Sequence, residues 1–458
     1  MHHDDSAPAP ARRWPSRAII WRWHFYAGLF CIPFILLLAA TGSVYLWRAE
    51  IEALLDRPYA AVTAPGQSRA TPSAIAQAAE QARPGMILHR YILPATRTQA
   101  VQVVVGEGRR ETRVWVHPRT LELLKVEDED ARPMNLLFHL HGELLLGTMG
   151  SYAVELAASW AVVMIGTGLV LWWPRGRRLS AVLLPRVTLR RRDGWRALHG
   201  AVGLWVSVAA LGFLLTGLPW ARSWGLWLDT LRSAAGEAPQ GRDWSVSREE
   251  MLARRAARDA EMRGGHQHMP GRHPAVRIDH AALDRLMPIV ERAALPTPVA
   301  LVPPAASGRP WVARVEAADR TQRSDLELDG ASGRVLARHD FAQRPLVDRV
   351  VAYGATAHEG RLWGRANQFA NLVVALGLMA LAGSGAVMWW KRKPADALGA
   401  PRAVPFRAGA GFALLLGALG LLLPLLGLSV LAILVIERLV LTRLPGPSRW
   451  LGLRAVPG

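Results

Sequence analysis

Four histidines stand in two matched pairs along the chain. His24 and His199 are each followed by Gly-Leu four residues later and by Thr-Gly seventeen residues later. His141 and His358 are each followed, at common spacings, by a leucine, three glycines and a Trp-Trp pair. Imidazole is a frequent axial ligand of haem iron, and imidazoles on two opposing helices can hold one planar haem between them. The pattern therefore predicts two bis-histidine haem sites, with the four histidines as ligands of the haem iron.

Two glycines accompany the first pair of histidines. Gly28 and Gly203 lie four residues after His24 and His199, so each shares a helical face with its histidine. Because glycine has no side chain, we expect both positions to leave space for a porphyrin. The other paired glycines are expected to let helices pack closely.

A further histidine complicates the second pair. His139 lies two residues before His141 and is a candidate substitute ligand or propionate partner, but its equivalent in the other half is Thr356. We therefore rank His139 below His141. A histidine at a membrane interface can also be a hydrated side chain that binds no metal. The matched spacing of both pairs favours ligation, because hydrated histidines have no reason to recur at fixed distances from the same neighbours.

Long apolar runs place these histidines beside membrane-spanning helices. A spanning helix needs about 20 predominantly apolar residues, and 51% of the 458 residues are hydrophobic. Residues 23–47 and 195–220 are predicted spans, with His24 and His199 in their first turns. Two more are predicted within 136–173 and 353–390, each together with the histidine segment that precedes it. The fold class expected is a membrane α-helical bundle of about five spans.

Positive charge orients the predicted spans. The chain has 55 Lys and Arg against 36 Asp and Glu, and short loops rich in Lys and Arg stay in the cytoplasm. This rule places the basic segments 1–22, 174–194 and 391–407 in the cytoplasm. The long polar segments 48–135 and 221–352 then face the periplasm of a bacterial inner membrane. Topology accounts for the excess positive charge, so the lipid bilayer is a partner and nucleic acid is not.

The fifth apolar run, residues 408–438, is too long for one simple span and too short for two spans with a turn. Pro424 lies near its middle, and proline kinks or breaks a helix. We interpret the run as one tilted helix kinked at Pro424 and followed by the tail 439–458. This interpretation puts Arg438 and Arg443 outside, against the charge rule, so a re-entrant hairpin remains the alternative.

The two polar segments share the pattern of a small α+β domain, a helix followed by alternating strands and a turn. Both units enter the membrane from the same side, so the chain is expected to be a tandem parallel repeat whose equivalent residues lie at equal depth. The expected helices are 72–82 and 281–293, and the expected strands are 100–105, 112–116 and 121–124 in the first segment and 311–315, 324–328 and 334–336 in the second.

Other motifs limit the cofactors. Cys31 is the only cysteine, which excludes a disulfide and a Cys-x-x-Cys-His attachment, so any haem is non-covalent haem b. Gly106-Glu107-Gly108 is not followed by a helix and is no dinucleotide motif, so electrons must come from quinol or a cytoplasmic flavoprotein. The stretch Gly264–His273 is rich in His and suits copper or another late metal in composition. We prefer a flexible polar loop there, because nothing fixes a coordination geometry.

Together these motifs resemble the PepSY-associated transmembrane family. The resemblance rests on Trp23-His24-Phe25-Tyr26-Ala27-Gly28, on Phe138-His139-Leu140-His141-Gly142-Glu143, and on Trp-Trp-Pro-Arg and Trp-Trp-Lys-Arg at two span ends. It implies two PepSY-like periplasmic domains and an oxidoreductase that carries electrons to a ferric siderophore or other ferric chelate for iron uptake. The match of the soluble segments is looser, since Asp329 stands where the first half has His117.

Two other classes of function remain open. PepSY-like domains also occur in inhibitory or binding roles, so a non-enzymatic membrane regulator or binding protein is one alternative. A metal or ion transporter built on parallel repeats is the other. Only a haem-dependent reductase requires a Soret band, so an absorbance spectrum separates the three classes.

Overall fold

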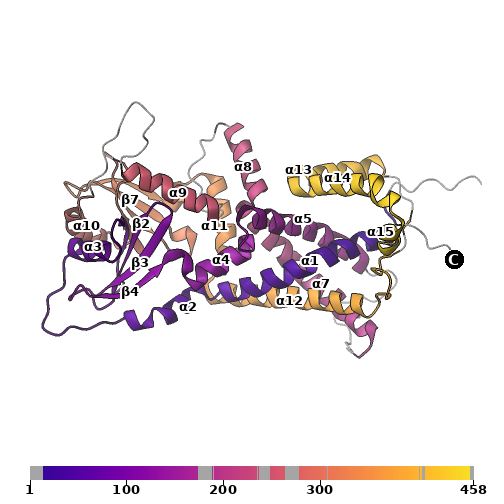
Figure 1. Cartoon of the computed structure of the whole chain (residues 1–458), viewed down its shortest axis with the longest axis horizontal. Helices are drawn as coiled ribbons and strands as arrows, with labels where there is room; N and C mark the ends of the chain where they lie inside the picture. The colour runs from indigo at the N-terminus through magenta and orange to yellow at the C-terminus, as the bar shows by residue number, and fades with distance from the viewer. Residues whose placement is uncertain are drawn as a thin grey trace, which may run out of the picture. The chain divides into compact units, whose positions relative to one another are not determined.

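The computed structural model describes residues 14–173, 188, 190–234, 236, 248–263, 278–306, 308–401, 403–404 and 408–453 (Figure 1). The chain divides into two compact units. We call Met1–Ser43, Met149–Ser245 and Leu372–Gly458 the helical unit, and Val44–Thr148 with Val246–Asn371 the sheet unit. The stretch Gly264–His273 and most of the expected loop 174–194 lie outside the described residues.

Five helices of the described residues are long and apolar enough to cross a membrane, so the chain is a membrane protein. Four of them contain 26–29 residues, about 39–44 Å at 1.5 Å per residue, which exceeds the hydrocarbon thickness of about 30 Å. These four confirm the first four predicted spans. The five are α1 (Arg17–Tyr45), α5 (Gly147–Trp172), α7 (Arg192–Gly217) extended to Trp220, α12 (Gly364–Trp390), and α14 (Pro424–Leu439) extended to Arg443.

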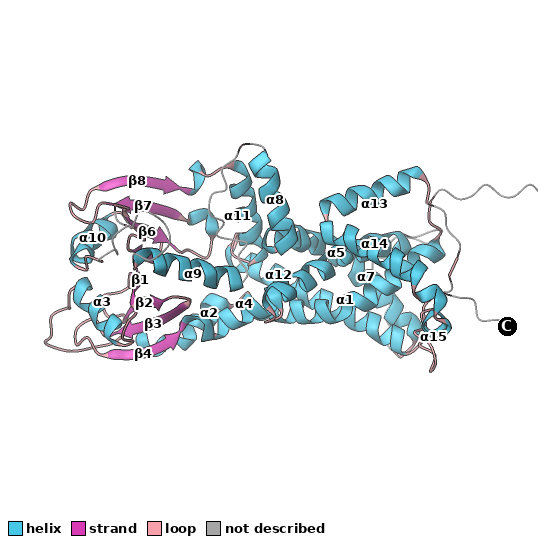
Figure 2. Cartoon of the chain, turned by 45° about the horizontal axis from the view of Figure 1, so that its top comes forward, coloured by secondary structure: helices cyan, strands magenta, loops and turns pink. Residues whose placement is uncertain are grey.

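The fifth apolar run is a helical hairpin, so its interpretation as one kinked helix is wrong. α13 (Ala410–Leu422) ends at Leu423, whose φ of −123° and ψ of 83° are not helical, and α14 begins at Pro424. In a continuous helix, residues seven apart are about 10.5 Å apart, yet a Cβ built on Gly420 would lie 3.1 Å from the Cα of Gly427. The proline breaks the helix here, and two glycines let its halves fold onto each other (Figure 2).

The segment after the hairpin returns to the beginning of α1. Arg22 Nη1 donates to the carbonyl oxygen of Gly452 at 2.9 Å. The amide of Leu398 donates to the carbonyl of Trp450, the last residue of α15 (Pro445–Trp450), at 3.1 Å. The basic residues after α14 thus lie at the same end of the helical unit as the basic start of α1, which removes the conflict with the charge rule.

α8 (Arg222–Ala234) follows α7 in the helical unit. The carboxylate of Glu155, on α5, accepts hydrogen bonds from the backbone N–H groups of Ser223 at 2.8 Å and Trp224 at 3.1 Å. These are donors that the first turn of a helix leaves unpaired. Glu155 is therefore explained as the cap of α8.

Each histidine segment forms a helix of its own before its span. α4 (Pro133–Glu143) carries His139 and His141, and α11 (Leu346–His358) ends at His358. A left-handed residue, Leu144 with φ 53°, ends α4, and Gly360 with φ 72° follows α11. The structure thus separates both histidine segments from the spans α5 and α12.

The strands of the sheet unit form one antiparallel sheet of eight strands, in the order β4-β3-β2-β1-β5-β6-β7-β8 (Figure 2). Two separate domains were expected, but the central strands β1 and β5 pair with each other, with Tyr91 opposite Leu301. The sequence patterns identified parts of β2, β3, β4, β6, β7 and β8 and missed β1 and β5. The strands are β1 (Ile87–Ile92), β2 (Val101–Glu107), β3 (Arg110–Val116), β4 (Leu123–Asp128), β5 (Val299–Val302), β6 (Trp311–Val315), β7 (Ser324–Leu328) and β8 (Val335–Asp340).

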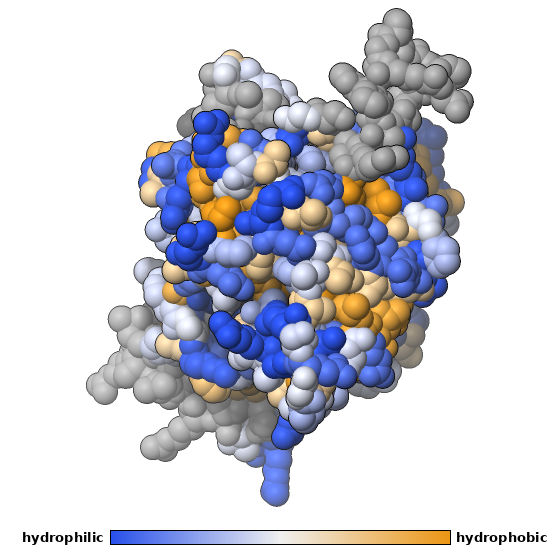
Figure 3. Space-filling model, turned by 90° about the vertical axis from the view of Figure 1, so that its left-hand side faces the viewer, coloured by the Kyte–Doolittle hydropathy of each residue, from blue (hydrophilic) through white to orange (hydrophobic). Residues whose placement is uncertain are grey.

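One face of this sheet carries the apolar core. The predicted helices α3 (Pro72–Gln81) and α10 (Ala281–Arg292) pack there and are joined by the hydroxyl of Ser73, which donates to Asp284 at 2.6 Å. In contrast to this buried core, the outer surface shown in Figure 3 is mostly hydrophilic, with hydrophobic patches between charged side chains. The core includes Ile75, Leu88, Val103, Val105, Val114, Leu283, Leu286, Leu301, Ala313 and Leu326.

The other face of the sheet carries charged side chains and α9 (Arg248–Met262). α9 belongs to the second polar segment, where the sequence predicted a small α+β domain with one helix, residues 281–293, and a loop. The sheet unit also contains α2 (Arg48–Leu55), which follows α1 directly. Arg365 Nη1 lies 2.8 Å from Glu50 of α2.

Candidate functional site

The structure brings His24 and His199 together in the helical unit. His24 is on α1 and His199 on α7, 175 residues later in the chain. Their ring centres are 6.3 Å apart and their planes are 81° apart. The first histidine pair predicted from spacing is therefore a pair in space.

Hydrogen bonds fix both imidazoles through the same ring nitrogen. His24 Nδ1 lies 3.0 Å from the carbonyl oxygen of Met164, and His199 Nδ1 lies 3.2 Å from that of Leu381. A carbonyl oxygen only accepts hydrogen bonds, so Nδ1 carries the hydrogen in both rings. The lone pair of the neutral ring is then on Nε2, the arrangement usual for a histidine that binds a metal.

A hydroxyl group is a second hydrogen-bond partner of each imidazole, and we call the carbonyl and the hydroxyl together the anchor of that histidine. Thr167 Oγ1 lies 3.2 Å from His24 Nδ1, and Ser384 Oγ lies 3.0 Å from His199 Nδ1. Each hydroxyl gives its own hydrogen to a carbonyl of its helix, that of Val163 or Met164 for Thr167 and that of Leu381 for Ser384. Each hydroxyl oxygen is therefore left to accept from the imidazole.

The spacing of the two rings fits two ligands of one metal ion. A metal–imidazole nitrogen bond is about 2.0–2.1 Å, and that nitrogen lies about 1.1 Å from the ring centre. Two imidazoles on opposite sides of one ion therefore have ring centres about 6.2–6.4 Å apart. The separation of 6.3 Å between His24 and His199 lies within this range.

The residues around the two rings correspond between the halves of the chain. Met164 and Leu381, Thr167 and Ser384, and Gly168 and Gly385 are each 217 residues apart, the offset that also relates His141 to His358. A Cβ on Gly168 would lie 3.1 Å from His24 Cε1, and one on Gly385 would lie 3.6 Å from His199 Cε1. These glycines were expected only to pack helices, and they also make room for the imidazoles.

Gly28 and Gly203 face neighbouring helices. A Cβ on Gly28 would lie 3.9 Å from Met164 Sδ, and one on Gly203 would lie 3.4 Å from Leu381 Cδ2. Each glycine therefore borders the residue whose carbonyl holds the nearby histidine. Their expected role in leaving space for a porphyrin stays a prediction.

The second pair, His141 and His358, lies in the sheet unit at equivalent places. His141 is in the last turn of α4 and His358 is the last residue of α11, and both side chains are partly exposed. The end of α11 is fixed by Asn371 Nδ2, which donates to the carbonyls of Ala357 at 2.8 Å and His358 at 3.0 Å. Ligation by this pair stays a prediction.

His139, ranked below His141 from the sequence, is almost fully buried. Its Nδ1 lies 2.5 Å from Oε1 of Glu143, one helical turn further along α4. Glu143 entered the sequence analysis only as part of a motif. The i,i+4 spacing of His and Glu on one predicted helix was the signal that could have identified this contact.

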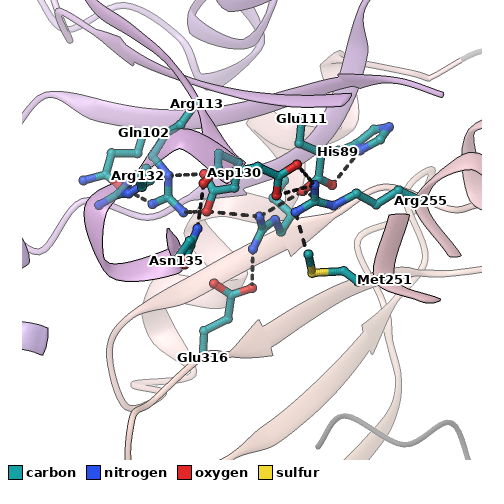
Figure 4. A network of polar contacts seen from close by, with 12 residues as sticks. His89, Gln102, Glu111, Arg113, Asp130, Arg132, Asn135, Met251, Arg255 and Glu316 are labelled. Carbon is teal, nitrogen blue, oxygen red and sulfur yellow. Dashed lines mark hydrogen bonds and ion pairs between the residues drawn. The ribbon is translucent and has the colours of Figure 1, made fainter. Parts of the chain in front are cut away.

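A layer of paired charges lies on the face of the sheet opposite the core (Figure 4). Arg113 binds both carboxylate oxygens of Glu129, at 2.7 and 2.8 Å. Arg255 of α9 lies 3.1 Å from Glu111 and 3.0 Å from Asp130. These charges already have partners, so we assign the layer a structural role in holding α9 on the sheet.

The carboxylates of this layer have lowered pKa values. Burial alone raises the pKa of Glu111, but the hydrogen bond from His89 and the charges of Arg90 and Arg255 hold it well below its ordinary value. For Glu129, burial is likewise outweighed, chiefly by the charge of Arg113, and the pKa is lowered to about 2. Both groups are therefore ionised at neutral pH and stabilise the fold through their arginine partners.

Cys31, the single cysteine, is buried between helices. Its thiol donates to the carbonyl of Ala157 on α5 at 3.5 Å. Among the described residues, no group of three or more His, Cys, Asp or Glu side chains is placed to hold a metal ion. The paired histidines are therefore the candidate site that the structure supports best.

The geometry defines a helical membrane protein with an attached sheet unit and a facing pair of anchored histidines. The chain belongs to the PepSY-associated TM region family, whose model matches residues 21–392. This match includes the four paired histidines and the whole sheet. A comparison with curated proteins found no match.

Proposed function

We propose that this protein is a membrane oxidoreductase that uses two haem b groups to pass electrons to a ferric chelate such as a ferric siderophore in iron uptake. The observation that carries the proposal is the pair His24 and His199. Both imidazoles are anchored through Nδ1, and their separation of 6.3 Å suits two ligands of one metal ion.

The chain's own residues hold and orient the first haem in this proposal. The carbonyls of Met164 and Leu381 and the hydroxyls of Thr167 and Ser384 fix the rings, so that each Nε2 is available to the iron. A bound haem supplies one-electron redox chemistry. The protein provides spacing and a low-dielectric environment for it. No proton transfer is asked of a side chain, so no catalytic acid or base is assigned.

Matched spacings in the two halves of the chain support a second haem held by His141 and His358. The offset of 217 residues relates these two histidines and also the anchors of the first pair. In the sheet, Thr112 pairs with Asp128 and Ser324 pairs with Asp340, positions related by a common offset of 212 residues. Repeated elements of this kind favour a repeated cofactor site.

The proposed orientation follows from charge. Basic residues at the start of α1 and after α5 and α12 favour a cytoplasmic N-terminus in a bacterial inner membrane, with PepSY-like domains in the periplasm. Electrons would then come from quinol or a cytoplasmic flavoprotein and reduce the chelate outside. Reduction weakens chelation because iron(II) carries less charge than iron(III).

An absorbance spectrum of the purified protein tests this proposal. We expect a Soret band and two haem b per wild-type chain. His24→Ala and His199→Ala should each remove the same haem, and the double variant should lose no more. His339→Ala is the matched control, because this exposed histidine contacts Glu327 in the sheet unit. All variants that lose a haem should stop reducing an external ferric chelate.

Two results would contradict the proposal. Wild-type protein made with ample haem supply that has no Soret band would favour a regulator or an ion transporter. Loss of both haems in the His24→Ala, His199→Ala double variant would show that the two histidines do not share one haem.

A further inference from the structure

Glu143 holds His139 through the nitrogen that leaves Nε2 available. Glu143 and His139 are both almost fully buried on α4, and Oε1 lies 2.5 Å from Nδ1. A carboxylate accepts the hydrogen of Nδ1, so the lone pair of the neutral ring is on Nε2. This is the carboxylate–histidine arrangement that orients many metal ligands.

The same carboxylate holds the beginning of α9. Both oxygens of Glu143 lie 3.2 Å from the backbone nitrogen of Arg248, the first residue of that helix. A neighbouring hydrogen bond also holds α9, because the hydroxyl of Thr148 donates to Glu249 at 2.7 Å. Further along α9, Arg255 is paired with Glu111 and Asp130. α9 therefore joins the histidine segment to the charged layer on the sheet.

This arrangement occurs in one half of the chain. At the offset of 217 residues, His139 corresponds to Thr356 and Glu143 to Gly360. Thr356 Oγ1 donates to the carbonyl of Ala352 at 2.8 Å and accepts from the amide of Arg320 at 3.2 Å. A backbone network therefore replaces the carboxylate–imidazole pair in the second half.

We infer that Glu143 is a positioning residue that presents His139 to iron and ties it to α9. The inference rests on the proposed function and ranks His139 above His141 as the ligand from the first half. A carboxylate is a stronger acceptor than the carbonyls and hydroxyls that hold His24 and His199. It makes Nε2 a better donor and favours ferric iron. The haem on His139 then has the lower reduction potential of the two.

Four variants of the full-length protein test this inference by haem content and potentiometric titration. His139→Ala should lose one haem, whereas His141→Ala should keep both. Glu143→Gln should keep both haems and move one midpoint potential to a more positive value, because an amide is the weaker acceptor. Glu249→Gln is the matched control, since it alters a neighbouring contact of α9 without touching His139, and should leave both potentials unchanged.

Hydrogen exchange of α9 separates positioning from general damage. Glu143→Leu removes the acceptor for the Arg248 amide and should speed exchange in the first turn of α9. His139→Ala leaves that acceptor in place and should not. If wild type holds two haems but His141→Ala loses one while His139→Ala does not, or if Glu143→Gln leaves both potentials unchanged, the inference is overturned. A wild type without haem would instead remove the proposed function.

Discussion

Alanine at Gly168 and at Gly385 gives matched perturbations of the two imidazoles. A Cβ at Gly168 would lie 3.1 Å from His24 Cε1, and one at Gly385 would lie 3.6 Å from His199 Cε1. Ordinary van der Waals contact begins at about 3.4 Å. Gly168→Ala must therefore move the His24 ring by about 0.3 Å, whereas Gly385→Ala need move nothing. The His24 ring is not free to move away, because Met164 and Thr167, which lie on the same helix as Gly168, hold its Nδ1.

Under the proposed function, the expected effect is a loss of haem affinity at the site of His24 and His199. Overpacking by a methyl group costs about 1–3 kcal/mol, and so small a displacement should cost about 1 kcal/mol, the lower end of that range. This corresponds to about a fivefold weaker binding of haem in Gly168→Ala. Gly385→Ala should stay within about twofold of wild type. Alanine is the better helix former, so loss of helix stability does not explain such a difference.

Haem titration of both purified variants, followed by reduced-minus-oxidised spectra, measures this difference. The reasoning is refuted if the two variants bind haem equally well, or if Gly385→Ala is the weaker. A loss of both haems in Gly168→Ala would also refute it, because the close contact involves His24 alone.

Two other predictions concern the sheet unit. Gly106→Ala would place a Cβ 2.2 Å from His89 Cε1, so we expect chemical denaturation to show a loss of about 3 kcal/mol in unfolding free energy. In a His89→Ala background the same substitution should cost less, because the ring it would meet is gone. If the losses of the two substitutions simply add, the contact is contradicted. The pKa of Glu129 is lowered to about 2 in the folded chain. The stabilisation of the fold by the ionised Glu129 is therefore complete above the unfolded pKa of about 4.3 and is lost as the pH falls toward 2. Glu129→Gln should flatten the pH dependence of stability in this window, and an unchanged slope would count against the Arg113 pairing.

The spans and the first histidine pair could be predicted from the sequence because each depends on local spacing. Apolar length alone identifies a spanning helix, and a common offset places His24 and His199 at equivalent positions on two of them. Pairing them in space required only the symmetry of a parallel repeat. The 6.3 Å separation of the rings agrees with that reasoning.

The central strands of the sheet were missed for a physical reason. β1 contains His89 and Arg90 in sequence, and a register shift between Leu88 and Arg90 interrupts its alternation of polar and apolar residues. Regular alternation of polar and apolar residues is the pattern that identifies a strand of an antiparallel sheet. Here α9 covers the polar face and supplies charged partners, which no pattern local to β1 can show.

The anchors of His24 and His199 were missed, and two of the four are backbone carbonyls. The carbonyls of Met164 and Leu381 have no signature in side-chain chemistry. Thr167 and Ser384 differ in residue type, so identity between the two halves does not reveal them although they share the offset of 217 residues. The sequence leaves the hairpin at Leu423 as an alternative, and the helix break at Leu423 together with the close approach of Gly420 and Gly427 establishes it.

The anchors are alike for the first histidine pair and unlike for the two histidine segments of the sheet unit. Carbonyl and hydroxyl groups hold both His24 and His199, so under the proposed assignment these two ligands are electronically equivalent. A carboxylate holds His139, whereas Asn371 fixes the backbone at His358. The Arg248 amide shares Glu143 with His139, so withdrawal of α9 would leave more of the carboxylate's charge to the imidazole and lower the potential of its haem further. Under the proposed function, an event on the sheet that moves α9 would then change the potential of this haem through one carboxylate.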